Sequence, residues 1–135
     1  MEKRQHQNIE LIHSFFLAYN QKNMKALESI LDPEINWFIP GEHPLSGLKK
    51  GVGGVLEYFK EMEYYQFQAS AIVMGVDDGY VVDCHRNWTD FNGERFETMS
   101  CLLWRIEEGK IKEVFNFPSD QKSVNEFFLK NRRLL

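Results

Sequence analysis

A long hairpin is predicted by residues 80–106, which read YVVDCHRNWTDFNGERFETMSCLLWRI. Two runs of alternating side chains flank Asn92-Gly93, a pair typical of two-residue turns between antiparallel strands. With the turn at this pair, Asp83 lies opposite Leu102, and His85 lies opposite Ser100. One face of the hairpin then carries Asp83, His85, Asn87, Thr98, Ser100, Leu102 and Trp104.

The opposite face of this hairpin also carries large side chains, namely Cys84, Arg86, Trp88, Met99, Cys101 and Leu103. Because apolar groups occupy both faces, we expect neither face to be bare to water. Helices can cover one face, and a second subunit is the natural cover for the other. The sequence therefore predicts a homodimer that forms through the outer face of the sheet.

Helices and further strands surround the hairpin. Apolar residues at helical spacing predict helices over residues 9–19, 24–31, 52–62 and 124–128. A short strand is expected over 34–39, after the Asp32-Pro33 stop signal. The turn pairs Asp78-Gly79, Asn92-Gly93 and Glu108-Gly109 delimit strands over 66–76, 80–90, 94–106 and 110–117. Helices followed by an antiparallel meander indicate an α+β fold, in one domain spanning residues 1–135.

Composition excludes several classes of function. The chain has 135 residues and a net charge of −4, which argues against nucleic acid or an anionic membrane as the main partner. No apolar run approaches the roughly 18 residues that a membrane helix needs. The two cysteines cannot form a disulfide framework, so a reducing cytoplasm is the expected compartment.

A second stretch, WFIPGEHPLSG at residues 37–47, is followed by Gly51, and the run LWRIEEGKI at 103–111 leads to Asp120. These stretches and the order of elements resemble the SnoaL-like branch of the nuclear transport factor 2-like, or ketosteroid isomerase-like, superfamily. The resemblance implies a cone-shaped, curved antiparallel sheet wrapped around three N-terminal helices, with a short C-terminal helix and a ligand pocket inside. Members include polyketide cyclases, isomerases, epoxide hydrolases and domains without catalysis, so the fold does not choose the function.

The same resemblance shows which acid–base groups of the superfamily are missing here. The three proton-handling positions of the steroid isomerases fall at about Phe15, Ile39 and Leu102, and none of these side chains can exchange a proton. Steroid isomerisation by that mechanism is therefore disfavoured. The cyclases' aspartate falls near Asp120, and the hydrolases' aspartate falls at about Asn116.

The strongest candidate constellation is Asp83, His85 and Asn87, which share the inward face of one strand. Buried polar groups need partners, a ligand or trapped water. Neighbours on one face lie roughly 6.6 Å apart, which predicts that Asp83 and His85 are too distant to bond well directly. They would instead hold one small molecule, with Asp83 or His85 as a catalytic base. The alternative is a structural hydrogen-bond network that lines a wet cavity.

Aromatic residues are predicted to line the cone, namely Phe15, Tyr19, Trp37, Phe59 and Trp104. Trp37 and Trp104 are the better candidates for ligand contact. Ser100 faces His85, but no nucleophile elbow surrounds it, which disfavours a hydrolase triad. His43 is expected to be a half-exposed turn residue at the mouth of the cone.

Metal and cofactor sites find no support in the sequence. The four histidines fall on different elements, and neither HExxH nor CxxC occurs, so no metal and no cofactor is predicted. Cys84 and Cys101 should face each other on the outer face. Two packed thiols are the expected state, and a redox bridge is the alternative.

Two functions of different classes remain open at this point. The first is an acid/base enzyme without a cofactor, an isomerase, cyclase or lyase that acts on a mostly apolar carbonyl compound. The second is a non-catalytic binding or carrier protein of the same fold. In both, a small apolar or cyclic molecule contacts Tyr19, Trp37, Asp83, His85, Asn87, Ser100, Trp104 and Asn116.

Overall fold

A computed structural model describes residues 6–133, which form four helices and six strands. In chain order these are α1 (Gln7–Asn20), α2 (Met24–Ile30), β1 (Leu31–Ile39), β2 (Gly47–Lys50), α3 (Gly51–Tyr65), β3 (Gln68–Asp77), β4 (Tyr80–Phe91), β5 (Glu94–Glu107), β6 (Lys110–Pro118) and α4 (Gln121–Lys130). Helices dominate the first half of this chain, and long strands dominate the second. The predicted α+β class is confirmed.

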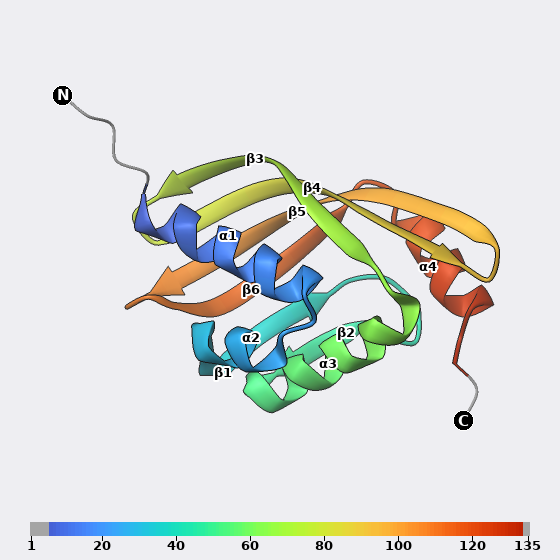
Figure 1. Ribbon diagram of the computed structural model, residues 1–135, viewed down its shortest axis with the longest axis horizontal. Helices are drawn as coiled ribbons and strands as arrows, with labels where there is room; N and C mark the ends of the chain where they lie inside the picture. Colours follow the sequence, from blue (N-terminus) through green and yellow to red (C-terminus); the bar gives the residue numbers. More distant parts are fainter. Residues whose placement is uncertain (1–5, 134–135) are drawn as a thin grey trace.

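The six strands form one curved, unclosed sheet in the order β2-β1-β6-β5-β4-β3. Neighbours pair antiparallel except β1 and β6, which run parallel. Irregular register within β3–β4, β5–β6 and β1–β6 accompanies the curvature, as β-bulges usually do. Figure 1 shows α1, α2 and α3 along one side of the sheet and α4 near the turn between β4 and β5.

The hairpin register predicted from the sequence is confirmed along the full length of β4 and β5. Asp83 pairs with Leu102, His85 with Ser100, and Asn87 with Thr98. The turn itself has positive φ angles at Asn92 (51°) and Gly93 (78°), the backbone that matches the twist of a two-residue hairpin. All side chains of this hairpin consequently face the side that the sequence assigned to them.

The structure corrects the sequence prediction around β1 and β2. β1 begins at Leu31 rather than at Glu34, so Pro33 lies inside the strand. Pro33 lacks an N–H, and the register of β1 against β6 shifts between Leu31 and Asn36, which accommodates the proline at the irregularity. The short edge strand β2 was not predicted, because its four residues carry no alternating apolar pattern.

Two separate apolar clusters make up the core. The larger one lies between α1, β1, α3 and the concave face of the sheet, and Phe15 is at its centre, 4.8 Å from the Trp104 ring and 5.7 Å from the Trp37 ring. The smaller one lies under α4 and consists of Leu45, Tyr65, Phe67, Phe127 and Phe128. Burial of each such side chain stabilises the fold by about 2 kcal/mol.

The outer face of the sheet, which none of the four described helices covers (Figure 1), carries exposed apolar residues. One row runs across β4, β5, β6 and β1 through Val82, Leu103, Phe115 and Phe38. An adjacent row runs through Val73, Cys84, Cys101 and Phe117, where Val73 is 61% and Phe117 57% exposed. Both faces of the sheet are therefore rich in apolar groups, as the sequence predicts.

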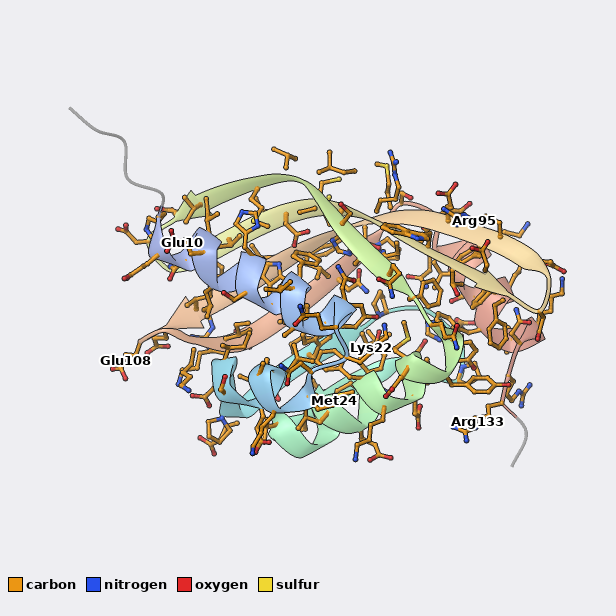
Figure 2. All side chains as sticks on the ribbon, in the orientation of Figure 1. Glu10, Lys22, Met24, Arg95, Glu108 and Arg133 are labelled. Carbon is orange, nitrogen blue, oxygen red and sulfur yellow. The ribbon has the colours of Figure 1, made fainter. Side chains whose placement is uncertain are left out.

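Charged side chains lie around the periphery of the molecule. Among the charged residues that Figure 2 labels, Lys22 is half-buried, and the others are exposed, namely Glu10, Arg95, Glu108 and Arg133. An ion pair between exposed groups, such as that of Arg95 with Asp90 at 3.1 Å, contributes little to stability. Within residues 6–133, no helix is long and apolar enough to cross a membrane.

Candidate functional site

A pocket of about 110 Å³ lies between the two apolar clusters and takes lining residues from both. Its aromatic wall comes from α1, β1 and α3 and consists of Phe15, Phe16, Tyr19, Trp37, Tyr58 and Phe59. Its polar wall is the concave face of β4, β5 and β6 and consists of His85, Asn87, Thr98, Ser100 and Asn116. Among the described residues that line it, none is Asp, Glu, Lys or Arg.

The polar wall follows directly from strand register. His85 is directly opposite Ser100, and Asn87 is directly opposite Thr98. Asn116 joins them from β6, where it pairs with Leu102. The Asn87 amide donates to the Ser100 hydroxyl over 3.4 Å, so neighbouring members of this wall also contact one another.

Behind the polar wall, Asp83 holds His85 in place. The Nδ1 atom of His85 lies 2.7 Å from Oδ2 of Asp83, and the indole N–H of Trp104 donates to Oδ1 over 2.5 Å. The side chains of Asp83 and His85 are 0% and 6% exposed. The prediction that Asp83 and His85 are too far apart to bond is therefore wrong. The estimate used the spacing of the backbone, whereas on the concave face of a curved strand both side chains lean toward each other.

These contacts assign the proton on the His85 ring. A carboxylate only accepts hydrogen bonds, so Nδ1 of His85 carries the proton and donates it to Asp83. In the neutral ring, the other nitrogen, Nε2, then carries the lone pair. Phe16 packs against the ring at 5.4 Å between centroids and limits its rotation. His85 lines the pocket with a nitrogen that is able to accept a proton.

Three residues of the pocket have a buried polar atom without a hydrogen-bond partner among the described residues. These atoms are Nε1 of Trp37, Oγ1 of Thr98 and Oδ1 of Asn116. The indole N–H can only donate, so it requires an acceptor, while the threonine hydroxyl can donate or accept. An orphaned buried polar group is costly, and a bound molecule would satisfy these atoms.

Two tyrosines add hydroxyl groups to the aromatic wall. Burial raises the pKa of Tyr19 well above its ordinary value, and burial together with the nearby Tyr19 raises that of Tyr58. Both hydroxyls therefore stay protonated at neutral pH and remain able to donate. Tyr19 was predicted as a ligand contact from its place on the first helix, and Tyr58 was not singled out.

The loop between β1 and β2 contributes Pro40 and His43 to the lining of the pocket. Nδ1 of His43 accepts from the backbone N–H of Leu45 over 3.2 Å, and its ring stacks on Phe128 of α4 at 4.7 Å. Ser46 accepts from the His43 N–H over 3.0 Å and donates to Pro40 over 3.1 Å. Burial, followed by the charge of Lys49, lowers the pKa of His43 to about 4. His43 is half-buried, as expected, and it also lines the pocket.

The loop docks on α4 because a glycine allows a close approach. Gly41 has a φ of +97°, and a Cβ at this position would lie within 2.4 Å of Asn125 Oδ1. That oxygen accepts from the N–H of Glu42 over 3.0 Å and from the Gln121 amide over 3.0 Å. The position of His43 is thus set by contacts on both sides of the loop.

The structure gathers most of the predicted site residues around one pocket. Six of them line it, namely Tyr19, Trp37, His85, Asn87, Ser100 and Asn116. Asp83 and Trp104 are not lining residues and lie behind His85. Asp120 is exposed and caps α4, accepting from the N–H of Ser123 over 3.1 Å.

The outer-face cysteines and the remaining titratable groups form no further centre. Cys84 pairs with Cys101 across β4 and β5, and both are free thiols. Burial and the neighbouring Cys84 raise the pKa of Cys101. Residues 6–133 contain no group of three or more His, Cys, Asp or Glu side chains that could hold a metal ion.

Comparisons with known proteins agree with this architecture. Residues 12–114 match the family of SnoaL-like domains. Bal32a, from a soil-derived mobile gene cassette, is 25% identical with a TM-score of 0.86, covering 90% of this chain and 96% of its own. An NTF2-like protein from Burkholderia pseudomallei is 15% identical with a TM-score of 0.83, over 92% and 98% of the two chains. A protein from Jannaschia sp. CCS1, assigned to the SnoaL-like polyketide cyclases, is 13% identical with a TM-score of 0.76, over 98% and 100%. These likenesses confirm the predicted cone fold.

The first prediction concerns the tautomer of His85. In Asp83→Asn, the new amide oxygen accepts from Trp104 and the amide N–H₂ donates to Nδ1 of His85, so the ring proton moves to Nε2. Long-range ¹H–¹⁵N spectra at pH 8 should show protonated Nδ1 in the wild type and protonated Nε2 in the variant. Asp90→Asn, an exposed change on the same strand, should leave the spectrum of His85 unchanged. An unaltered tautomer in Asp83→Asn would show that Asp83 does not set it.

The second prediction concerns acid and His43. The pKa of His43 is about 4 in the folded chain and 6.5 ordinarily, so between these values the unfolded chain binds more protons. The free energy of unfolding therefore decreases as the pH falls through this range. At pH 5 the loss is about 2 kcal/mol for a fully shielded ring and about 1 kcal/mol after solvent screening of a half-exposed one. Urea unfolding at pH 7 and pH 5 should show a smaller decrease in His43→Asn than in the wild type. Equal decreases would contradict the assignment.

Proposed function

The chain belongs to the SnoaL-like domain family, and from this membership and its uncharged aromatic pocket we propose that it binds a small, neutral, cyclic carbonyl compound. We propose further that it transfers a proton at the carbon next to that carbonyl, without a cofactor. The observation that carries the proposal is His85, a buried pocket histidine whose Nδ1 is hydrogen-bonded to a buried carboxylate and whose Nε2 has no hydrogen-bond partner among residues 6–133.

The lining of the pocket supports a neutral ligand. Because none of the described lining residues carries a full charge, a charged ligand would be buried without a partner, which is costly. The aromatic wall favours a flat or cyclic molecule over a flexible chain. A cavity on the order of 100 Å³ suits a molecule with a single ring or a pair of fused rings.

The polar wall supports proton transfer. Nε2 of His85 would take the proton from the α-carbon, the C–H electron pair would form the enolate, and the imidazolium would be stabilised by Asp83. Trp37, Ser100 and Asn116 would orient the carbonyl and stabilise its developing negative charge. Return of the proton to the same or another carbon completes an isomerisation or an exchange, and no other reactant is needed.

A non-catalytic carrier remains the second candidate. It is favoured by the apolar residues at Phe15, Ile39 and Leu102, the positions where the resemblance places the acid–base groups of the steroid isomerases. In a carrier the Asp83–His85 pair would only orient the ligand. The two functions differ in whether the bound molecule exchanges a proton.

The third prediction separates these candidates with 1-indanone, a flat bicyclic ketone with an enolisable CH₂ group. We expect 1-indanone to shift the NMR signal of the Trp37 indole N–H and to exchange its α-protons in D₂O faster than in buffer. In His85→Asn, the amide keeps the bond to Asp83 but removes the base, so exchange should fall by about 100-fold or more while binding persists. Indane-2-carboxylate, which is charged, should bind roughly tenfold more weakly than 1-indanone.

Each outcome decides between the candidates. Binding of 1-indanone without faster exchange would favour the carrier and reject catalysis. Exchange that survives His85→Asn would reject His85 as the base. Failure of the neutral ketone to bind, or tighter binding of the carboxylate, would overturn the proposed ligand class.

We also propose that two copies of the chain associate through the outer face of the sheet. Apolar side chains form adjacent rows there, and the thiols of Cys84 and Cys101 lie among them. A face with the same apolar rows on each copy suits a twofold symmetric contact. A soluble monomer rarely leaves a continuous apolar patch of this kind uncovered.

The fourth prediction tests this association. Sedimentation of the wild type should give twice the mass of the 16.0 kDa chain. Phe117→Lys places a charge in one of the apolar rows of the outer face and should shift the equilibrium to the monomer. Leu17→Lys, an equally exposed apolar position on α1, is the matched control and should remain dimeric. A monomeric wild type, or a dimer unaffected by Phe117→Lys, would reject this face as the interface.

A further inference from the structure

We propose that His43 is a second ligand-binding residue, which donates a hydrogen bond from Nε2 to an acceptor group at the outer end of the bound molecule. The inference rests on the proposed function and narrows the ligand class. The molecule would be a neutral ring compound with two oxygen functions at opposite ends, a carbonyl near His85 and a second acceptor near the mouth.

The bonds within the loop assign the tautomer of His43. Its Nδ1 accepts a hydrogen bond from the N–H of Leu45, so Nδ1 carries no proton in the neutral ring. The proton of neutral His43 is therefore on Nε2. His85 has the opposite tautomer, because its Nδ1 donates to Asp83. One pocket thus contains an imidazole that donates and an imidazole that accepts.

The ring of His43 has little freedom to turn away. One of its faces stacks on Phe128, and the edge with Nδ1 is bonded to the loop. The loop is held in turn by Ser46 and by the docking of Glu42 on α4. Nε2 has no hydrogen-bond partner among residues 6–133, and His43 lines the pocket, so the edge that carries Nε2 is the one left for a ligand.

His43 remains a neutral donor over the physiological range. Burial and the charge of Lys49 lower its pKa to about 4, so it does not become a cation when the ligand binds at neutral pH. A neutral N–H supplies no counter-charge for a buried anion, so an uncharged acceptor, such as a carbonyl or ether oxygen, avoids the cost of an unpaired buried charge. His43 would therefore select the ligand by hydrogen bonding and would not supply a proton to the reaction.

The topology sets the length of a ligand that reaches both histidines. His43 follows β1 and His85 lies on β4, and the order β1-β6-β5-β4 puts about 14 Å between these two strands. Both side chains line the pocket, so the distance between the two imidazole rings is shorter than the distance between the two strands. A single ring or two fused rings with an oxygen function at each end would span what remains.

The test uses two probes that differ at one end. 5-Methoxy-1-indanone carries an ether oxygen opposite its ketone, and 5-ethyl-1-indanone has nearly the same shape without that acceptor. We expect the wild type to bind the methoxy compound roughly three- to tenfold more tightly than the ethyl compound, the effect of one neutral hydrogen bond. Affinities from calorimetry give the ratio directly.

Two substitutions separate the two nitrogens of His43. The amide oxygen of His43→Asn can still accept from Leu45 but leaves no donor at the Nε2 position, so the preference should disappear. The amide N–H₂ of His43→Gln can replace the Nε2 donor, so the preference should return. His13→Asn, the same substitution at an exposed histidine of α1, should keep the wild-type preference. Melting curves confirm that each variant is folded.

The binding measurements distinguish an error in the role of His43 from an error in the proposed function. If neither probe binds, the proposed ligand class is wrong. If both bind but the wild type shows no preference, or His43→Asn keeps it, His43 does not contact the ligand. ¹⁵N spectra of the free protein provide a test without any ligand, since a proton on Nδ1 of His43 would overturn the assignment directly.

Discussion

The carboxylate of Asp83 lies fully out of solvent, and both of its oxygens are engaged, one by the indole of Trp104 and one by the imidazole of His85. A buried carboxylate without partners would destabilise the fold by several kcal/mol. The two hydrogen bonds of Asp83 therefore constrain the positions of Trp104 and His85. They hold Trp104 against Phe15 in the larger core cluster and hold His85 against the pocket. A shift of β4 by one residue would move Asp83 to the outer face and place Cys84 inside. The Asn92-Gly93 turn fixes the register of β4 and β5, and therefore also which of their side chains face the pocket.

The pocket exists because the two apolar clusters do not merge. Phe15 and Trp37 belong to one cluster and Phe67 and Phe128 to the other, and all four line the space between them. A fold selected only for stability would fill such a space, since each unfilled volume forfeits packing contacts. Unpartnered polar atoms in the wall add to this cost. Both features are typical of a binding site that sacrifices some stability for function.

Sequence reasoning was most successful where one pattern repeats over many residues. The strands from residue 68 onward and the pairing of His85 with Ser100 follow from alternation and turn chemistry, and these are local signals. β2 was missed because four residues at a sheet edge carry no such pattern. The bond between Asp83 and His85 was missed because backbone spacing says nothing about how two side chains lean.

The role of His43 could not be read from the sequence for a different reason. It depends on the Leu45 N–H within the loop and on Phe128, which is distant in the chain and arrives only when α4 docks. Gly41 and the two prolines signal a loop, but they do not say which helix will cover it. The contact with Leu45 sets the tautomer of the ring, and the contact with Phe128 contributes to its burial. No pattern in the sequence around His43 predicts either contact.

The positions that carry acid–base groups in the steroid isomerases, by resemblance, fall at Phe15, Ile39 and Leu102, and all three line this pocket as buried apolar side chains. The pocket of this chain is thus apolar at the three positions where the resemblance places those groups. Here the polar wall lies on β4, β5 and β6, and the proposed base, His85, is a histidine oriented by a carboxylate behind it. In the proposed reaction, His85 would accept and return the proton, while its carboxylate partner Asp83 stays outside the lining of the pocket. The negative charge of Asp83 is thus buried one layer below the surface that a ligand would contact. This arrangement suits a pocket that binds an uncharged ligand and, as proposed, transfers a proton.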